Sequence, residues 1–219
     1  MMDRPQRDVK RRRSYDASRR RDQARRNRTR IVETAERLFL RDGYSATTVQ
    51  AIAAAAGVSA DTIYKSFGGK AGLIRAIRDR VLEGEGPVPA ERRSDDIQER
   101  ESDPRTIMRA WGGFVAELAP RGSPIFLLIR DAAAGDAEVR ALRDELDADR
   151  LRRMTANARR LRDAGHLRPG ISLAHAADIL WTYSSPELYE LLVLRRGWTP
   201  ERYGRYVADA MINALLQGS

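Results

Sequence analysis

Residues 47–70 read TTVQAIAAAAGVSADTIYKSFGGK, and this stretch decides how the N-terminal part of the chain folds. The spacing of its apolar residues predicts two short amphipathic helices. Gly57 allows a sharp turn between them, and Ser59 can cap the second helix. The stretch therefore predicts a helix-turn-helix unit.

The second of these helices carries an unusually polar outer face. Short polar side chains of this kind meet base edges when a recognition helix lies in the major groove of DNA. Lysine can bond guanine, glutamine adenine and aspartate cytosine, and alanine can touch the thymine methyl group. The candidates for base reading are Gln50, Ala60, Asp61, Thr62 and Lys65. Asp61 can equally cap its own helix, because a carboxylate is favoured near a helix N-terminus.

The positive charge of the chain is concentrated at its N-terminus. Residues 1–30 hold 13 Lys and Arg and 4 Asp, a net charge of +9, whereas the remaining 189 residues hold 27 basic and 27 acidic residues. A basic block attracts a polyanion such as nucleic acid. We expect residues 1–22 to form a basic arm that is disordered in the free protein. The arginines expected to add phosphate or minor-groove contacts are Arg25, Arg26, Arg28 and Arg30.

The rest of the sequence predicts a connector followed by a larger helical domain. Glycine, proline and charged residues dominate residues 83–102, where we expect little buried core. Signals for helix starts follow at Asp103-Pro104, Ser123-Pro124, Asp136, Ser172 and Thr199-Pro200. An apolar stripe follows each start, and no stretch is typical of a strand. The expected fold class is all-α, with about nine helices in total.

The N-terminal motif resembles the TetR (tetracycline-repressor-like) family of bacterial regulators. That family has a helix ending near an aromatic and a glycine, then Thr-x-x-x-Ile-Ala, Ala-Gly-Val-Ser, Thr-x-Tyr, Phe and Lys. The corresponding residues are Phe39, Gly43, Thr48, Ile52, Ala53, Ala56, Gly57, Val58, Ser59, Thr62, Tyr64, Phe67 and Lys70. The resemblance covers residues 25–82 in detail. The chain departs from the family at Asp61, where glycine or another small residue is usual.

The resemblance implies roles for individual residues of the motif. Thr48 and Lys70 would contact phosphates, and Tyr64 would pack against or bond the DNA backbone. Thr48 and Lys70 also lie at predicted helix N-termini, where backbone N–H groups favour phosphate. Alternatively, Thr48 is only a cap and Lys70 a solvated charge. The predicted DNA-binding residues are Arg25, Arg28, Thr48, Gln50, Ser59, Ala60, Asp61, Thr62, Tyr64, Lys65 and Lys70.

The resemblance also implies how the chain is divided. We expect a basic arm over 1–22, a helix-turn-helix DNA-binding domain over 23–82, a connector over 83–102 and an effector-binding and dimerisation domain over 103–219. A bound effector would shift the helix that starts near residue 70 and links the two domains, and so change the spacing of two recognition helices.

Aromatic and soft side chains are frequent in the expected effector-binding domain. Ordinary core packing explains any single one of them, but this family's helical domain usually encloses a pocket. An apolar pocket binds a small apolar or aromatic effector. The predicted pocket residues are Met108, Trp111, Phe114, Phe126, Met154, Trp181 and Tyr183.

The last two helices, expected at about 173–193 and 200–216, carry apolar stripes that are wide for a monomer. Exposed apolar patches mark interfaces, so we expect a homodimer. A two-fold dimer places two recognition helices roughly 34 Å apart and implies a near-palindromic operator. The predicted interface residues are Leu188, Leu191, Leu192, Tyr203, Tyr206, Met211 and Leu215.

Several other classes of protein are disfavoured. The chain has no cysteine, which excludes a disulfide framework, thiolate metal sites and a cysteine nucleophile, and fits a cytoplasmic protein. No stretch is long and apolar enough for a membrane span, and His166 and His175 have no partners for a metal site or catalysis. Residues 68–70 (GGK) superficially suggest a phosphate loop, but Tyr64 stands where that motif needs glycine. We expect no cofactor, metal or enzymatic activity.

The sequence therefore predicts a DNA-binding transcriptional regulator, a ligand-responsive repressor that binds double-stranded DNA as a homodimer. The alternative is a sequence-tolerant DNA-packaging protein without a small-molecule effector. That alternative predicts broad binding and no release by a ligand.

Deleting residues 1–22 should make DNA affinity less dependent on salt. The slope of log K against log salt concentration scales with the number of phosphates neutralised, and the arm carries much of the positive charge. Titrations of the full and truncated chains at several salt concentrations measure the two slopes. Equal slopes would show that the arm neutralises no phosphates.

Overall fold

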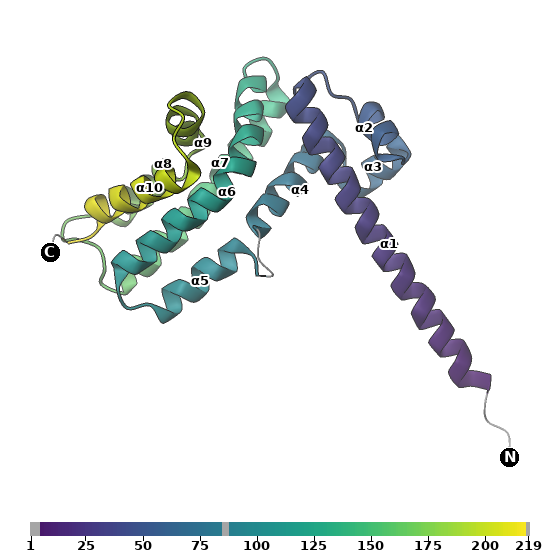
Figure 1. Cartoon of the computed structure of the whole chain (residues 1–219), viewed down its shortest axis with the longest axis horizontal. Helices are drawn as coiled ribbons and strands as arrows, with labels where there is room; N and C mark the ends of the chain where they lie inside the picture. Colours follow the sequence, from purple (N-terminus) through teal and green to yellow (C-terminus); the bar gives the residue numbers. More distant parts are fainter. Residues whose placement is uncertain (1–4, 85–87, 218–219) are drawn as a thin grey trace. The chain divides into compact units, whose positions relative to one another are not determined.

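The computed structural model describes residues 5–84 and 88–217, and it divides into two compact units. We call residues 1–77 the head and residues 78–219 the body. Both units consist of helices, and no strand occurs within the described ranges (Figure 1). The all-α prediction is confirmed, with ten α-helices and one π-helical segment in these ranges. In this part of the chain, no helix combines the length and the apolar character needed to cross a bilayer.

The head is built around a helix-turn-helix unit. Its helices are α1 (Pro5–Asp42), α2 (Val49–Ala56), α3 (Ala60–Phe67) and the first turns of α4 (Lys70–Glu83). Helices α2 and α3 lie beside the C-terminal part of α1 (Figure 1). Phe39, Ile52 and Ile63, one from each of these three helices, are completely buried. The core of the head therefore fixes where α3 lies.

Caps and glycines set the ends of the two short helices. The Thr48 hydroxyl accepts a hydrogen bond from the Ala51 N–H, and the Ser59 hydroxyl accepts one from the Thr62 N–H. Gly57, with φ 65°, occupies the left-handed region that favours glycine and ends α2. Both helices lie where these local signals predict them.

Helix α1 is longer than predicted. It begins at Pro5, whereas the sequence predicts a disordered arm over residues 1–22. Residues 1–4 lie outside the described residues, and the backbone over 5–22 is helical; whether this segment is ordered in the free protein stays a prediction. No glycine or proline occurs between Pro5 and Gly43. Arginine, lysine, glutamine and alanine are good helix formers, and their propensity favours a helix despite the repulsion of like charges.

The connector also differs from its prediction. Residues 90–100 form helix α5 (Ala90–Arg100), in a stretch where we expect little buried core. Ser94 is buried and accepts a hydrogen bond of 3.0 Å from the Trp111 indole Nε1. Asp95 accepts hydrogen bonds from the guanidinium groups of Arg153 and Arg160. Polar contacts hold α5 on the body, and an apolar pattern does not reveal such contacts.

The remaining helices complete the body. They are α6 (Pro104–Ala132), α7 (Ala137–Asp163), α8 (Leu173–Tyr183), α9 (Pro186–Tyr189), the π-helical segment η1 (Glu190–Arg195) and α10 (Pro200–Leu215). Their core includes Ile107, Met108, Leu161, Leu180 and Val207. Four of the five predicted helix starts, all but Ser123-Pro124, begin a helix of the body. The single helix expected at about 173–193 is instead divided into α8, α9 and η1.

Helix α6 runs without a break through two prolines. The sequence predicts that Ser123-Pro124 starts a new helix, but Pro120 and Pro124 both lie inside α6. A proline inside a helix removes one backbone hydrogen bond and crowds the preceding turn. The apolar stripe continues beyond the prolines to Ile125 and Ile129, each only 1% exposed, and this packing holds the helix together.

Helices α6 and α10 approach each other closely at two glycines. A Cβ atom added at Gly112 would overlap the carbonyl oxygen of Gly204, and one added at Gly204 would overlap the carbonyl oxygen of Gly112. Both glycines are buried. Their missing side chains let the two backbones touch, so α10 lies flat on α6.

Replacing Gly204 with alanine should destabilise the body. The new methyl group would push the two backbones apart, and overpacking of this kind costs about 1–3 kcal/mol. Chemical denaturation of the Gly204→Ala variant measures the loss. Gly113→Ala is the matched control, because a Cβ atom there meets nothing within 4 Å, and it should be neutral or stabilising. Equal effects of the two substitutions would contradict the close contact.

Candidate nucleic-acid interface and body cavity

Helix α3 separates a buried face from an exposed polar face. Ile63 lies fully in the head core, while Asp61, Tyr64 and Lys65 point to solvent. Tyr64 is 51% exposed, which is high for an aromatic side chain. A short helix with this division presents its polar side chains and one aromatic ring to a partner.

Asp61 and Lys65 form an ion pair of 2.7 Å along the surface of α3. Both side chains are more than two-thirds exposed, and exposed pairs of this type contribute little stability. Ser59, rather than Asp61, caps the helix by side-chain hydrogen bonding. The structure therefore does not support the alternative that Asp61 caps α3.

Lys70 turns into the head rather than toward solvent. Its Nζ donates a hydrogen bond of 2.9 Å to the carbonyl oxygen of Tyr44 and lies 4.3 Å from the centroid of the Tyr44 ring. This contact ties the start of α4 to the loop between α1 and α2. The alternative of a solvated charge is wrong, and the predicted phosphate contact would have to compete with Tyr44.

Arg28 also packs on the head. Its guanidinium lies 4.4 Å from the centroid of the Phe67 ring and donates a hydrogen bond of 3.2 Å to the carbonyl oxygen of Ser66. Arg28 thereby holds the end of α3 against α1. These residues lie far apart in the chain, so their contact has no local signal in the sequence.

The other predicted DNA-binding residues lie at or near the surface of the head. The Ser59 and Thr62 hydroxyl oxygens are 2.9 Å apart at the N-terminus of α3. The exposed members of the predicted set are Arg25, Arg28, Thr48, Gln50, Ser59, Asp61, Tyr64 and Lys65, and the half-buried members are Ala60, Thr62 and Lys70. The head therefore offers one polar surface made of α3 and the N-terminus of α2.

The body contains a cavity of about 510 Å³. This volume lies in the range of about 300–1,000 Å³ that is typical of small-molecule sites. Five of the seven predicted pocket residues line it, namely Trp111, Phe114, Phe126, Met154 and Tyr183. Two do not: Met108 is completely buried in the core, and Trp181 lies beneath the guanidinium of Arg150. Helical periodicity shows that a side chain is buried but not whether it faces a cavity or solid core.

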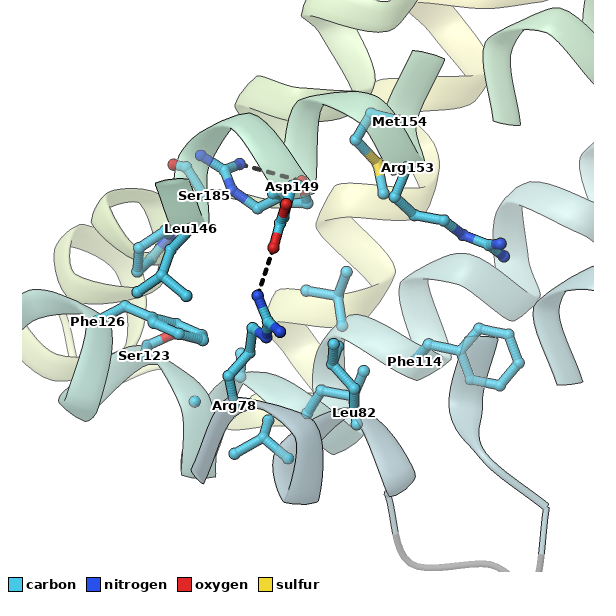
Figure 2. Close-up of a pocket in the computed structure, with 18 of the residues that line it drawn as sticks. Arg78, Leu82, Phe114, Ser123, Phe126, Leu146, Asp149, Arg153, Met154 and Ser185 are labelled. Carbon is cyan, nitrogen blue, oxygen red and sulfur yellow. Dashed lines mark hydrogen bonds and ion pairs between the residues drawn. The ribbon is translucent and has the colours of Figure 1, made fainter. Parts of the chain in front are cut away.

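Charged side chains lie among the apolar walls of this cavity. Figure 2 shows Arg78 of α4 and Asp149 of α7 pointing toward one another, and their ion pair measures 2.5 Å. Phe126 and Leu146 lie to one side of this pair and Phe114 to the other. A search for pocket residues among apolar side chains alone misses these charges.

Comparison with known proteins identifies the head. Residues 31–77 match the model of the family described as "Bacterial regulatory proteins, tetR family". Over these residues the head is therefore similar to the TetR family. The matched residues include α2 and α3, which carry the polar surface described above, and the C-terminal part of α1 that buries their apolar faces.

Two regulators from Pseudomonas putida are similar to this chain. The HTH-type transcriptional regulator TtgR and the probable HTH-type transcriptional regulator ArpR are each 36% identical over 88 residues. The match covers 40% of this chain and only 40% of the length of each relative.

Solved structures of similar fold cover more of the chain. NalD, a repressor of the MexAB-OprM multidrug efflux pump in Pseudomonas aeruginosa, aligns over 89% of this chain and 99% of its own, with a TM-score of 0.69 and 22% identity. SmeT in complex with triclosan aligns over 88% and 93%, with a TM-score of 0.67 and 23% identity. At these identities the likeness concerns the fold.

The predicted dimer residues fall into two groups. Tyr203, Met211 and Leu215 are at most 4% exposed within the single chain, so they cannot form an interface with another copy. They face inward because α10 packs on α6 at the paired glycines. Leu188 and Leu192 are half-buried against the body core, and Leu191 and Tyr206 are exposed. Leu194, which is absent from the predicted set, is 53% exposed and joins Leu191 and Tyr206 among the exposed apolar residues.

The described residues offer no cluster of metal ligands. Among the described residues, no group of three or more His, Asp or Glu side chains is placed to hold a metal ion. The two histidines lie at the positions the sequence indicates, His166 just after α7 and His175 in the first turn of α8.

Replacing Lys70 with methionine should destabilise the head. The substitution keeps most of the aliphatic stem but removes the hydrogen bond to Tyr44 and the cation–π contact, a loss of about 1–3 kcal/mol. Lys65→Met is the control, because the ion pair of Lys65 is exposed. Denaturation curves of both variants give the comparison. Weakened DNA binding of Lys70→Met at unchanged stability would instead make Lys70 a phosphate contact.

Proposed function

We propose that this chain is a sequence-specific DNA-binding transcriptional regulator, a ligand-responsive repressor that acts in the cytoplasm as a homodimer. The observation that carries the proposal is the polar face of α3, held outward by the buried Ile63 and by the Ser59 cap in a domain that matches the TetR family. A helix of this kind fits the major groove, where its side chains meet base edges and phosphates.

Within this proposal, the residues of the head divide into those that touch DNA and those that support them. Tyr64, Lys65 and Gln50 are exposed and reach the groove or the sugar–phosphate backbone. Lys70 and Arg28 hold the head together, since both already bond main-chain carbonyl oxygens. The ion pair between Asp61 and Lys65 opens at low cost, so either side chain can bond a base.

The proposed dimer uses the exposed apolar side chains of η1 and α10. Leu191, Leu194 and Tyr206 are each at least 42% exposed. The Trp198 ring packs edge-on against the Tyr206 ring at 5.5 Å between centroids and extends the apolar surface. A second copy would cover this surface and place two recognition helices roughly 34 Å apart, one turn of DNA.

The proposed effector site is the body cavity. Structures of similar fold include SmeT with triclosan and a putative transcriptional regulator from Saccharomonospora viridis with choline, which supports a ligand role for a helical body. Arg78 lines the cavity on α4, and α4 begins in the head at Lys70. A ligand that separates Arg78 from Asp149 therefore acts on a helix that continues into the head. Coupling requires the two states to differ in ligand affinity.

Selection of bound DNA from a random pool tests the proposal. We expect a near-palindromic site with two half-sites one turn apart. Tyr64→Ala should weaken binding to the selected site about tenfold, as loss of one good contact does. Leu40→Ala is the control, because Leu40 is similarly exposed, at 46%, but lies on α1, outside the helix-turn-helix formed by α2 and α3.

Three results would contradict parts of the proposal. Equal binding to all duplexes would favour the alternative of a sequence-tolerant DNA-packaging protein. A monomer at the concentrations that bind DNA would contradict the dimer. An effector that occupies the cavity and leaves operator affinity unchanged would contradict ligand control.

A further inference from the structure

A half-buried cation lines the body cavity. Arg150 of α7 lines the cavity and lies 4.4 Å from the centroid of the Trp181 ring. Its guanidinium donates hydrogen bonds to the Trp181 carbonyl oxygen, to the Ser184 hydroxyl at 3.2 Å and to Asp147 at 3.3 Å. A guanidinium has five N–H donors, so these three bonds leave two. Burial lowers the pKa of Arg150, which shows that its charge is poorly solvated.

A buried hydroxyl lies beside this cation. Tyr203 of α10 lines the cavity and is only 1% exposed, and its ring packs edge-on against Tyr189 at 5.5 Å. Among the residues that the structure describes, the Tyr203 hydroxyl has no hydrogen-bond partner. Burial raises the pKa of Tyr203, so the hydroxyl stays protonated at neutral pH, while the charge of Arg150 acts in the opposite direction. The hydroxyl is therefore a donor in the wall of the same cavity as Arg150.

A second donor lies on the same face of α7. Arg150, Met154 and Asn157 are spaced four and three residues apart, and all three line the cavity. Asn157 is 4% exposed, and its Oδ1 accepts a hydrogen bond of 3.4 Å from Gln98 Nε2. That bond leaves the amide nitrogen of Asn157 as a donor, about 10 Å along the helix axis from Arg150.

Two carboxylates of α7 in the cavity wall are already paired. Asp149 pairs with Arg78 and Arg152, and Asp147 pairs with Arg150. On α7 and α10, the polar groups that remain for a ligand include the donors of Arg150, Asn157 and Tyr203. A buried donor without a partner is costly, and a ligand with a matching acceptor removes that cost.

We propose that the effector of this chain is an amphiphile with an apolar body and an anionic head, a carboxylate or an ionised phenol, and that Arg150 and Tyr203 hold this head. The inference rests on the proposed role of the cavity as a ligand site. The anion receives charge-assisted hydrogen bonds, which compensate for its desolvation. The apolar body lies against Trp111, Phe126 and Met154. A quaternary ammonium head would instead place a second cation beside Arg150.

Three probes that share a ten-carbon chain test the assignment on the full-length protein: decanoate, decanol and decyltrimethylammonium. Isothermal titration calorimetry at neutral pH should rank decanoate first and the ammonium last, with a difference of at least about tenfold. Tyr203→Phe should weaken decanoate binding about tenfold and leave decanol less affected, since a hydrogen bond to a charged group is the stronger one. Tyr206→Phe is the matched control on the same helix, because that hydroxyl is exposed and does not line the cavity.

A second variant guards against a folding artefact. Arg150→Met removes the charge and should abolish the preference for decanoate over decanol, and thermal unfolding shows whether the variant is intact. The assignment is overturned if the ammonium probe binds as tightly as decanoate. It is also overturned if the Tyr203→Phe variant prefers decanoate over decanol as strongly as the unchanged protein does. In both cases the cavity remains a ligand site. If none of the probes binds, the assignment falls together with the ligand role of the cavity, while the DNA selection still decides the role of the head.

Discussion

The contact between Gly112 and Gly204 organises the body. Two backbones can lie this close only where both side chains are absent, and this proximity directs the apolar residues of α10 inward. Tyr203 precedes Gly204, so the same contact places the phenol in the cavity wall. It also removes most of the apolar stripe of α10 from the surface, and leaves Tyr206 on the opposite side. The shape of the cavity and the composition of the proposed dimer surface thus share one steric origin.

The parts of the fold that the sequence predicts are those specified by neighbouring residues. Caps such as Ser59 and turns such as Gly57 act within one helical turn, so α2 and α3 lie where the sequence indicates. The contacts of Lys70 with Tyr44 and of Arg28 with Phe67 join distant residues through polar or cation–π geometry. Hydrophobic periodicity carries no information about such contacts.

The same limit explains the errors in the body. An apolar stripe predicts that a helix face is covered, but it does not say whether the same chain or a second copy covers it. Tyr203, Met211 and Leu215 are covered by their own chain. Likewise, frequent aromatic residues predict an apolar interior, whereas the chemistry of the cavity depends on Arg150 and on which of its neighbours have already used their hydrogen bonds.

Ion pairs between charged side chains attach α5 to α7. Asp95 joins α5 to α7 through Arg153 and Arg160, and burial opposes its ionisation. The two arginines outweigh this effect and hold the pKa of Asp95 below its usual value. Because a carboxylate bonded in this way resists protonation, α5 stays attached to α7 well below neutral pH.

The length of α1 has a mechanical consequence. Residues 5–30 of this helix span about 39 Å at 1.5 Å per residue, slightly more than one turn of B-form DNA. A stiff rod of this length approaches a duplex along a tangent, whereas a flexible chain can follow the curve of a groove. A helix of this length would lose little backbone freedom on docking to a partner, because its shape is already set.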